Sequence, residues 1–203
     1  MTETDERTDE RQALIEASQQ VLNDSARCDF KVRNVCRQAR LSTHSFYRHF
    51  SGKDELVVAL LEREVHALAA QLEAESRQAR TATERVWNYV LAELDRAGEF
   101  RSGGGFLVDK LNWRTVMTDH PEALERCIAA LSAPLVTALA DGHANGELRC
   151  ADPVADARAI LYIIRGNALD WPNGSGHTVR EDLKRSVVQL ISRAIGLPAR
   201  TDG

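Results

Sequence analysis

The side chains best suited to chemistry lie between residues 43 and 48, on what the sequence predicts to be one short helix. Thr43, His44, Tyr47 and Arg48 are left to face outward from it, and they are polar or cationic. An arginine can bind a guanine with two hydrogen bonds, and a threonine can pack against the methyl group of a thymine. The pattern therefore predicts a helix that enters DNA.

Two predicted helices and a tight turn position these side chains. The apolar residues of the first helix recur at the spacing of one buried face, at Val32, Val35, Cys36 and Ala39. After the turn, Ser42 is placed to cap the helix predicted at 43–50 with its hydroxyl group. Phe46 and Phe50 lie one turn apart and serve as the inward anchors of that helix.

The distribution of charge supports the same interpretation, although the whole chain has a net charge of −4. The segment from Arg27 to Lys53 contains seven lysines or arginines and a single acid, Asp29, which gives about +6 and leaves about −10 for the rest. A basic patch on an acidic body directs contact with phosphate to one part of the protein.

The 203 residues predict an all-α fold of about nine helices, because aromatic residues make up only 5% and alternating β-branched residues are nearly absent. Residues 1–8 are acidic and polar, and we expect a disordered tail there. The predicted helices span about 9–23, 31–39, 43–50, 53–77, 81–97, 106–117, 121–142, 152–169 and 179–195.

Local signals refine several of the helix ends. Ser51 and Asp54 resemble a capping box at the start of the fourth helix, in which Asp54 would bind the Ser51 amide. Pro121 suits the first position of the seventh helix. Pro134 lies inside that helix, where it is expected to produce a kink or an interruption.

The four cysteines, Cys28, Cys36, Cys127 and Cys150, have no CxxC spacing, so neither a zinc site nor a disulfide framework is expected. No metal or cofactor is predicted. We find no apolar run of the roughly 18 residues that span a bilayer and no signal-peptide pattern at the N-terminus. We therefore expect a cytoplasmic protein that does not contact a membrane.

The last two predicted helices carry more apolar surface than one face requires, which indicates burial by a partner. For terminal helices we favour a homodimer with a four-helix interface. Its expected residues are Val154, Ala157, Leu161, Ile164 and Ala168 in one helix and Leu183, Val187, Leu190, Ile191 and Ala194 in the other.

The stretch from about Gln12 to Leu60 resembles the DNA-binding domain of the TetR family of bacterial transcriptional regulators. Its second helix, turn, recognition helix and the start of its fourth helix resemble the segments FKVRNVC (30–36), ARLS (39–42), FYRHF (46–50) and KDEL (53–56). Two positions depart from the family pattern. Arg40 replaces the usual turn glycine, so either it adopts a left-handed conformation or the turn is altered. Lys31 replaces a small hydroxyl residue, which puts the capping of the second helix in doubt.

The resemblance implies roles for individual residues. Thr43, His44, Ser45 and Arg48 would lie nearest the base edges in the major groove, while Lys31, Arg33, Tyr47, His49 and Lys53 would contact the phosphate backbone. A dimer would bind a near-palindromic double-stranded operator with half-sites about one turn, roughly 34–36 Å, apart. Repression is the commoner behaviour in this family.

The resemblance also implies a division into a DNA-binding domain at 9–52, a connecting fourth helix at 53–80 and a ligand-binding and dimerisation domain at 81–198. A small, largely apolar effector would bind in the last of these. The expected pocket residues are Trp87, Phe106, Leu107, Leu111, Trp113, Met117, Leu131, Leu135 and Ile163, with Arg165 or Asn167 as a polar anchor.

Two alternatives to a small-molecule sensor stay open. In the first, the protein is a regulator that senses oxidants through the thiol of Cys127 or Cys150. The acid and histidine groups at 119–122 and 141–147 would belong to an enzyme, but they show no nucleophile motif and no HExxH spacing, so we expect no enzymatic activity.

Overall fold

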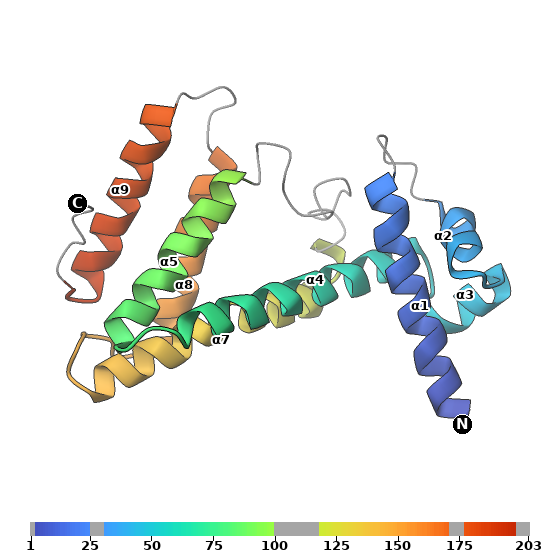
Figure 1. The fold of residues 1–203 in the computed structure, drawn as a ribbon, viewed down its shortest axis with the longest axis horizontal. Helices are drawn as coiled ribbons and strands as arrows, with labels where there is room; N and C mark the ends of the chain where they lie inside the picture. The colour runs from blue at the N-terminus through green and yellow to red at the C-terminus, as the bar shows by residue number, and fades with distance from the viewer. Residues whose placement is uncertain (1–2, 25–30, 100–117, 171–176, 198–203) are drawn as a thin grey trace. The chain divides into compact units, whose positions relative to one another are not determined.

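The computed structural model describes residues 3–24, 31–99, 118–170 and 177–197, and the secondary structure within these ranges consists of helices joined by turns (Figure 1). The helices are α1 (Glu3–Asp24), α2 (Val32–Ala39), α3 (Thr43–His49), α4 (Lys53–Ser76), α5 (Ala82–Glu99), α7 (Pro121–Ala144), α8 (Pro153–Asp170) and α9 (His177–Ala194). The predicted all-α fold is confirmed. The expected sixth helix, 106–117, lies outside the described residues.

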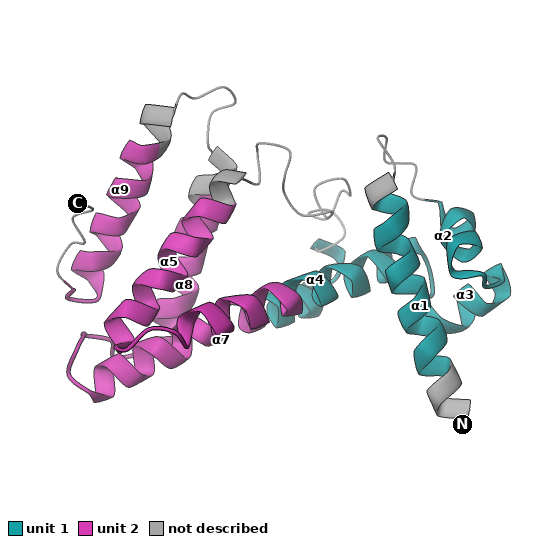
Figure 2. Cartoon of the chain, viewed as in Figure 1, with its two compact units in different colours: residues 1–65, 106–127 teal, residues 66–105, 128–203 magenta. Residues whose placement is uncertain are grey.

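The chain divides into two compact units, which Figure 2 shows in different colours. Unit 1 comprises residues 1–65 and 106–127, and unit 2 comprises residues 66–105 and 128–203. Helices α4 and α7 each contribute to both. Unit 1 thus takes in the first part of α4 and the start of α7 together with the predicted DNA-binding domain.

The core of unit 1 holds α1, α2 and α3 together. Leu14 of α1, Val35 of α2 and Phe46 of α3 have no exposed surface. The rings of Phe46 and Phe50 lie 5.6 Å apart between centroids. Both predicted anchors are therefore buried, and the amphipathic spacing of α2 and α3 explains why these short helices pack as they do.

The core of unit 2 forms where α5 packs against α8, with α9 contacting both. Val86, Val90 and Ile164 are fully buried there. The buried Tyr89 donates a hydrogen bond from its hydroxyl to the carbonyl of Leu131 at 2.9 Å, which satisfies the polar end of a large side chain in the core.

The start of α1 and the interior of α7 differ from the prediction. Helix α1 begins at Glu3, within the segment for which a disordered tail is expected. Helix α7 begins at Pro121 as predicted and is continuous through Pro134 to Ala144, so the expected interruption is absent. A proline removes one backbone hydrogen bond, and the flanking turns of this long helix maintain it across that gap.

Helix α7 also corrects the expectation about apolar runs. It contains an 18-residue window of mean hydropathy 1.5, which by length and composition alone suffices to cross a membrane. Of this window, 44% is buried inside the protein, and the core helix of a globular domain passes the same test of length and composition. One such helix is weak evidence for a membrane span.

Candidate nucleic-acid interface

Helix α2 begins without a side-chain cap. Lys31 occupies the cap position and forms no capping hydrogen bond with its side chain, so the doubt about its capping role is confirmed. Its carbonyl accepts the first backbone bond of the helix from the Asn34 amide at 2.8 Å. Lys31 and Arg33 are both exposed, and the two cations lie at the same end of the helix.

The turn after α2 adopts the left-handed conformation at Arg40, with φ 57° and ψ 33°. The Leu41 amide donates to the Cys36 carbonyl at 2.9 Å, and the Arg40 amide donates to the Arg37 carbonyl at 3.2 Å. These two bonds form a Schellman motif, which normally has glycine at the left-handed position. The first of the two alternatives for Arg40 is therefore correct.

Helix α3 is capped as predicted, because the Ser42 hydroxyl accepts a hydrogen bond from the Ser45 amide at 2.9 Å. Thr43, His44 and Tyr47 are exposed on its outer side, and Tyr47 has an exposed fraction of 63%. An aromatic side chain left so open on a helix anchored by buried residues is available to a partner.

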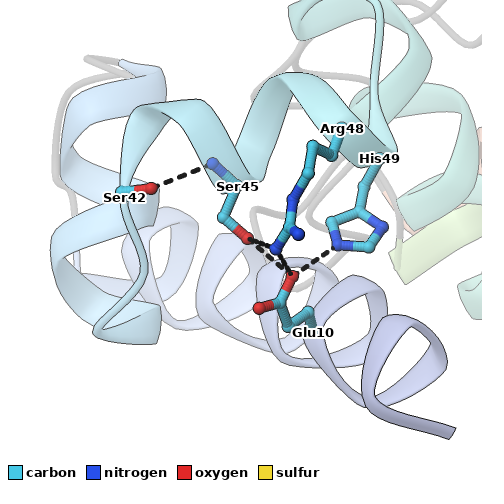
Figure 3. A network of polar contacts seen from close by, with 5 residues as sticks. All are labelled: Glu10, Ser42, Ser45, Arg48 and His49. Atoms are coloured by element: carbon cyan, nitrogen blue, oxygen red, sulfur yellow. Dashed lines mark hydrogen bonds and ion pairs between the residues drawn. The ribbon is translucent and has the colours of Figure 1, made fainter. Parts of the chain in front are cut away.

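The side of α3 that faces α1 carries Ser45, Arg48 and His49, which meet Glu10 of α1 (Figure 3). Ser45 and the His49 side chain are only 5% and 4% exposed. Ser45 and His49, for which DNA contact is expected from the sequence, therefore turn toward α1 in this structure and are covered. Arg48 is half exposed and remains at the surface.

Sequence reasoning missed Glu10. It lies four residues before the buried Leu14, and the i, i+4 spacing places both on the inner face of α1. Its hydrogen bonds from Ser45 and then from His49 lower its pKa from 4.5 to about 2. The inward position of an acid on an otherwise apolar stripe was the signal available in the sequence.

The start of α4 has a different cap from the predicted one. Glu55, rather than Asp54, accepts a hydrogen bond from the Ser51 amide at 2.6 Å. This bond lowers the pKa of Glu55. The helix begins one residue later than a cap at Ser51 requires, with Gly52 preceding Lys53, so the third helical residue is Glu55. Lys53 is exposed at this helix start.

The predicted effector pocket is only partly covered by the described residues. Phe106, Leu107, Leu111, Trp113 and Met117 lie outside them, and so does the side chain of Asn167. Trp87, Leu131 and Leu135 are buried in unit 2, and Ile163 is half-buried. Arg165 forms an ion pair with the buried Glu93 at 2.8 Å.

A hollow of about 450 Å³ does occur in unit 2, but at another place. Residues of α4, α5 and α7 line it, among them His66, Arg85 and Pro134, together with Arg77 just after α4, and it includes none of the predicted pocket residues. Four of its eleven lining residues are alanines. Arg77 pairs with Glu73 at 2.6 Å within the lining, and Arg85 pairs with an aspartate of α7 at 2.8 Å. The lining therefore combines small apolar side chains with charged ones.

The expected dimer face is largely used inside the protomer. Ala157, Leu161, Ile164, Val187 and Ile191 are at most 4% exposed, because α5, α8 and α9 pack together within unit 2. Leu183 is half-buried, and the side chain of Ala168 lies outside the description. Val154, Leu190 and Ala194 are exposed, and so is Tyr162, which the sequence did not single out.

Cys127 and Cys150 are buried, and two acids of the candidate enzyme groups bind other parts of the protein. Burial raises the pKa of Cys127 to about 11 and that of Cys150 to about 12. Asp141 pairs with Arg85 at 2.8 Å, and Glu147 accepts a hydrogen bond from the backbone amide of residue 83 at 3.0 Å. These two carboxylates hold helices together, as ion pairs and caps commonly do.

Comparison with known proteins places the interface in a family context. Residues 14–60 match the family model described as bacterial regulatory proteins, tetR family. No curated protein sequence matches the chain. The matched segment contains α2, α3 and the turn between them, which are the elements that carry the exposed polar face.

Solved structures resemble the fold over nearly the whole chain. NemR of E. coli in its reduced form is 21% identical with a TM-score of 0.65, and the match covers 94% of this chain and 100% of NemR. RolR in complex with resorcinol is 12% identical with a TM-score of 0.70, covering 97% and 92%. FadR of Bacillus subtilis in complex with stearoyl-CoA is 17% identical with a TM-score of 0.63, covering 89% and 96%. At these identities the similarity establishes the fold.

Proposed function

Because the chain belongs to the TetR family of bacterial regulatory proteins, we propose that this transcriptional regulator is a repressor. It binds a near-palindromic operator as a homodimer and leaves the DNA when a small effector binds. It acts in the cytoplasm, where bacterial DNA is found. The observation that carries the proposal is the outer side of α3, where Thr43, His44 and Tyr47 are exposed on a helix anchored by buried residues.

The charge around α3 supports DNA as its partner. Lys31, Arg33, Arg40 and Lys53 are exposed in unit 1 near the two ends of α2 and the ends of α3. Cations grouped in this way bind phosphates without regard to sequence, as Tyr47 does in this proposal, while Thr43 and His44 contact base edges. Arg48 is half exposed, and it must break its ion pair with Glu10 before it can bind a base.

The DNA proposal is tested with the Tyr47→Ala/Lys53→Ala double variant and the DNA that flanks the protein's own gene. We expect fluorescence anisotropy to show weaker binding and a salt dependence reduced by about two units of slope, because each protomer of the dimer loses one lysine–phosphate contact. Arg80→Ala is the matched control, since Arg80 is an exposed cation of unit 2. Equal affinity of the double variant and the control would remove the phosphate roles.

The exposed apolar residues of α8 and α9 support a homodimer. Val154, Tyr162 and Leu190 are 55%, 53% and 52% exposed on neighbouring helices, so their apolar surface is available to a second copy of the chain. We expect Tyr162→Glu/Leu190→Glu to convert the dimer to a monomer in light scattering after gel filtration, because the charges would be buried without partners. A variant that stays dimeric would move the interface elsewhere.

Two observations support a small-molecule effector. RolR and FadR, which share the fold, were solved with resorcinol and stearoyl-CoA respectively. The hollow of unit 2 is lined by four alanines, a proline and several polar or charged side chains, and sites for small molecules combine apolar surface with a few polar groups. An effector bound there would favour a separation of the two α3 helices that does not fit DNA, which is a shift of population.

The effector proposal is tested by thermal-shift screening of apolar metabolites, followed by operator binding for each compound that stabilises the protein. A true effector raises the melting temperature and lowers operator affinity, because it binds one conformation better than the other. Ala133→Trp is designed to fill the hollow from an exposed position in α7. An effector that binds this variant normally would exclude the hollow as its site.

Thiol sensing by Cys127 or Cys150 is the second candidate. It is compatible with the similarity to NemR, whose structure was solved in a reduced form. The raised pKa values of both thiols work against it, because the thiolate is the reactive species. A Cys127→Ser/Cys150→Ser variant that no longer responds to oxidant would favour it over a small-molecule effector.

A further inference from the structure

One carboxylate of α1 binds three side chains of α3. Oε2 of Glu10 accepts hydrogen bonds from the Ser45 hydroxyl at 2.6 Å and from Nη2 of Arg48 at 2.8 Å, and it lies 2.7 Å from Nε2 of His49. Figure 3 shows the three side chains converging on Glu10 from the same side of α3. Arg48 also donates to the Ser45 hydroxyl at 3.3 Å, so the contacts form a connected network.

Two members of this network are closed off from water. Ser45 and the His49 side chain are 5% and 4% exposed, so water cannot easily replace the carboxylate as their partner. A buried donor without an acceptor is costly, and hydrogen bonds to a charged group are stronger than neutral ones. Arg48 is half exposed and depends less on Glu10. The network is therefore anchored mainly through Ser45 and His49.

The positions of these contacts around α3 matter because the helix has only seven residues. Phe46 and Phe50 form one line of attachment to the core, and a single line lets so short a helix roll about its axis. Ser45 and His49 form a second line with the same spacing of four, about 100° around the helix from the first. Two lines of attachment fix the rotation.

We propose that Glu10 is a positioning residue for DNA recognition. It fixes the rotation of α3 so that Thr43, His44 and Tyr47 face the DNA together. The inference rests on the proposed function of α3 as the helix that reads DNA. Glu10 itself touches no base in this role and acts through Ser45 and His49.

Electrostatics alone predicts a different result, which makes the proposal testable. Removing a carboxylate beside a DNA-binding helix reduces repulsion of phosphate and should raise the affinity for any DNA. Loss of positioning instead reduces the discrimination between a specific sequence and a random one, because base contacts need a defined geometry and phosphate contacts do not. The ratio of the two affinities separates these effects.

The experiment compares Glu10→Gln with Glu16→Gln in the full-length protein. Glu16 is an exposed acid of the same helix whose partners are Gln12 of α1 and, at 4.0 Å, Arg63 of α4, so the control matches the change in charge. The probes are a duplex selected by the wild-type protein from a random pool and a scrambled duplex of equal length. We expect the ratio of affinities to fall about tenfold in Glu10→Gln and to stay unchanged in Glu16→Gln.

Hydrogen exchange measured by mass spectrometry gives a readout without DNA. We expect faster exchange in residues 43–49 of Glu10→Gln than of Glu16→Gln, with α2 unaffected. Ser45→Ala should shift both readouts in the same direction and add little to Glu10→Gln, because the two residues share one interaction.

An unchanged affinity ratio in Glu10→Gln, or equal exchange of residues 43–49 in both glutamine variants, overturns the proposal. Faster exchange throughout unit 1 also overturns it, because it would indicate a general structural role. If the wild-type protein selects no sequence from the pool, the proposed function fails, while hydrogen exchange still decides whether Glu10 orders α3.

Discussion

Replacing Arg40 by glycine should stabilise the protein. Arg40 has φ 57° in the Schellman motif that ends α2, and it is the single non-glycine residue with positive φ in the described parts of the chain. A side chain in this conformation places its Cβ close to the backbone, whereas glycine has no Cβ. The backbone hydrogen bonds of the motif do not depend on the side chain, so they persist in the variant.

The size of the effect follows from two opposing contributions. Relief of the left-handed conformation is worth about 1–2 kcal/mol. Glycine also makes the unfolded chain more flexible, which costs about 0.4–1 kcal/mol. We therefore expect Arg40→Gly to gain roughly 1 kcal/mol in the free energy of unfolding. Because Arg40 is exposed, loss of its side chain removes little packing.

Arg40→Ala separates conformation from charge, because alanine also loses the cation but keeps a Cβ. Urea denaturation followed by circular dichroism should give a higher midpoint for the glycine variant than for the alanine variant, with equal slopes. The alanine variant should remain within about 0.5 kcal/mol of the wild type. Equal midpoints for the two variants would refute the reasoning, since the left-handed backbone would then cost Arg40 nothing.

Two further predictions concern the packing and the thiols of the described residues. A Cβ at Gly142 would lie 2.7 Å from Cδ2 of the buried Leu148, so Gly142→Ala should lower the free energy of unfolding by about 1–3 kcal/mol. A Cβ at Gly166 would meet nothing within 4 Å, so Gly166→Ala should raise the free energy of unfolding by up to about 1 kcal/mol. The same urea assay measures both variants. Cys127 and Cys150 should react slowly with iodoacetamide at pH 8 in the folded protein and quickly in urea, because their raised pKa values leave little thiolate in the folded state. Mass spectrometry detects the label. Fast labelling of either cysteine before unfolding would show that its thiol is accessible and ionised.

The sequence alone predicted much of the DNA-binding part because its signals are local. The cap at Ser42 and the anchors Phe46 and Phe50 each depend on residues three or four positions apart, so pattern and structure agree there. The left-handed turn at Arg40 was one of two alternatives and needed the backbone angles to decide. The prediction named Asp54 as the partner of the Ser51 amide, but Glu55 accepts that bond. The two acids are adjacent in the sequence, so a capping pattern that is uncertain by one residue fits either of them.

The apolar stripes of α8 and α9 illustrate what a pattern leaves undecided. Helical spacing correctly indicated that Ala157, Leu161 and Ile164 are buried, but it does not name the surface that buries them. That surface is α5 of the same protomer. Only the packed structure shows which apolar residues of these helices, such as Tyr162, remain exposed.

Sequence by itself determined which residues form α2, the turn and α3, because helix propensity, capping and amphipathic spacing act between near neighbours in the chain. The tertiary structure decided which polar residues of α3 face outward. Ser45 and His49 turn inward because Glu10, more than thirty positions earlier, lies across from them, and hydrogen bonds to a charged group outweigh exposure to water. Local spacing does not specify a contact over that separation, so the sequence predicted the outward direction of Thr43, His44 and Tyr47, whereas the cover over Ser45 and His49 appears only in the folded structure.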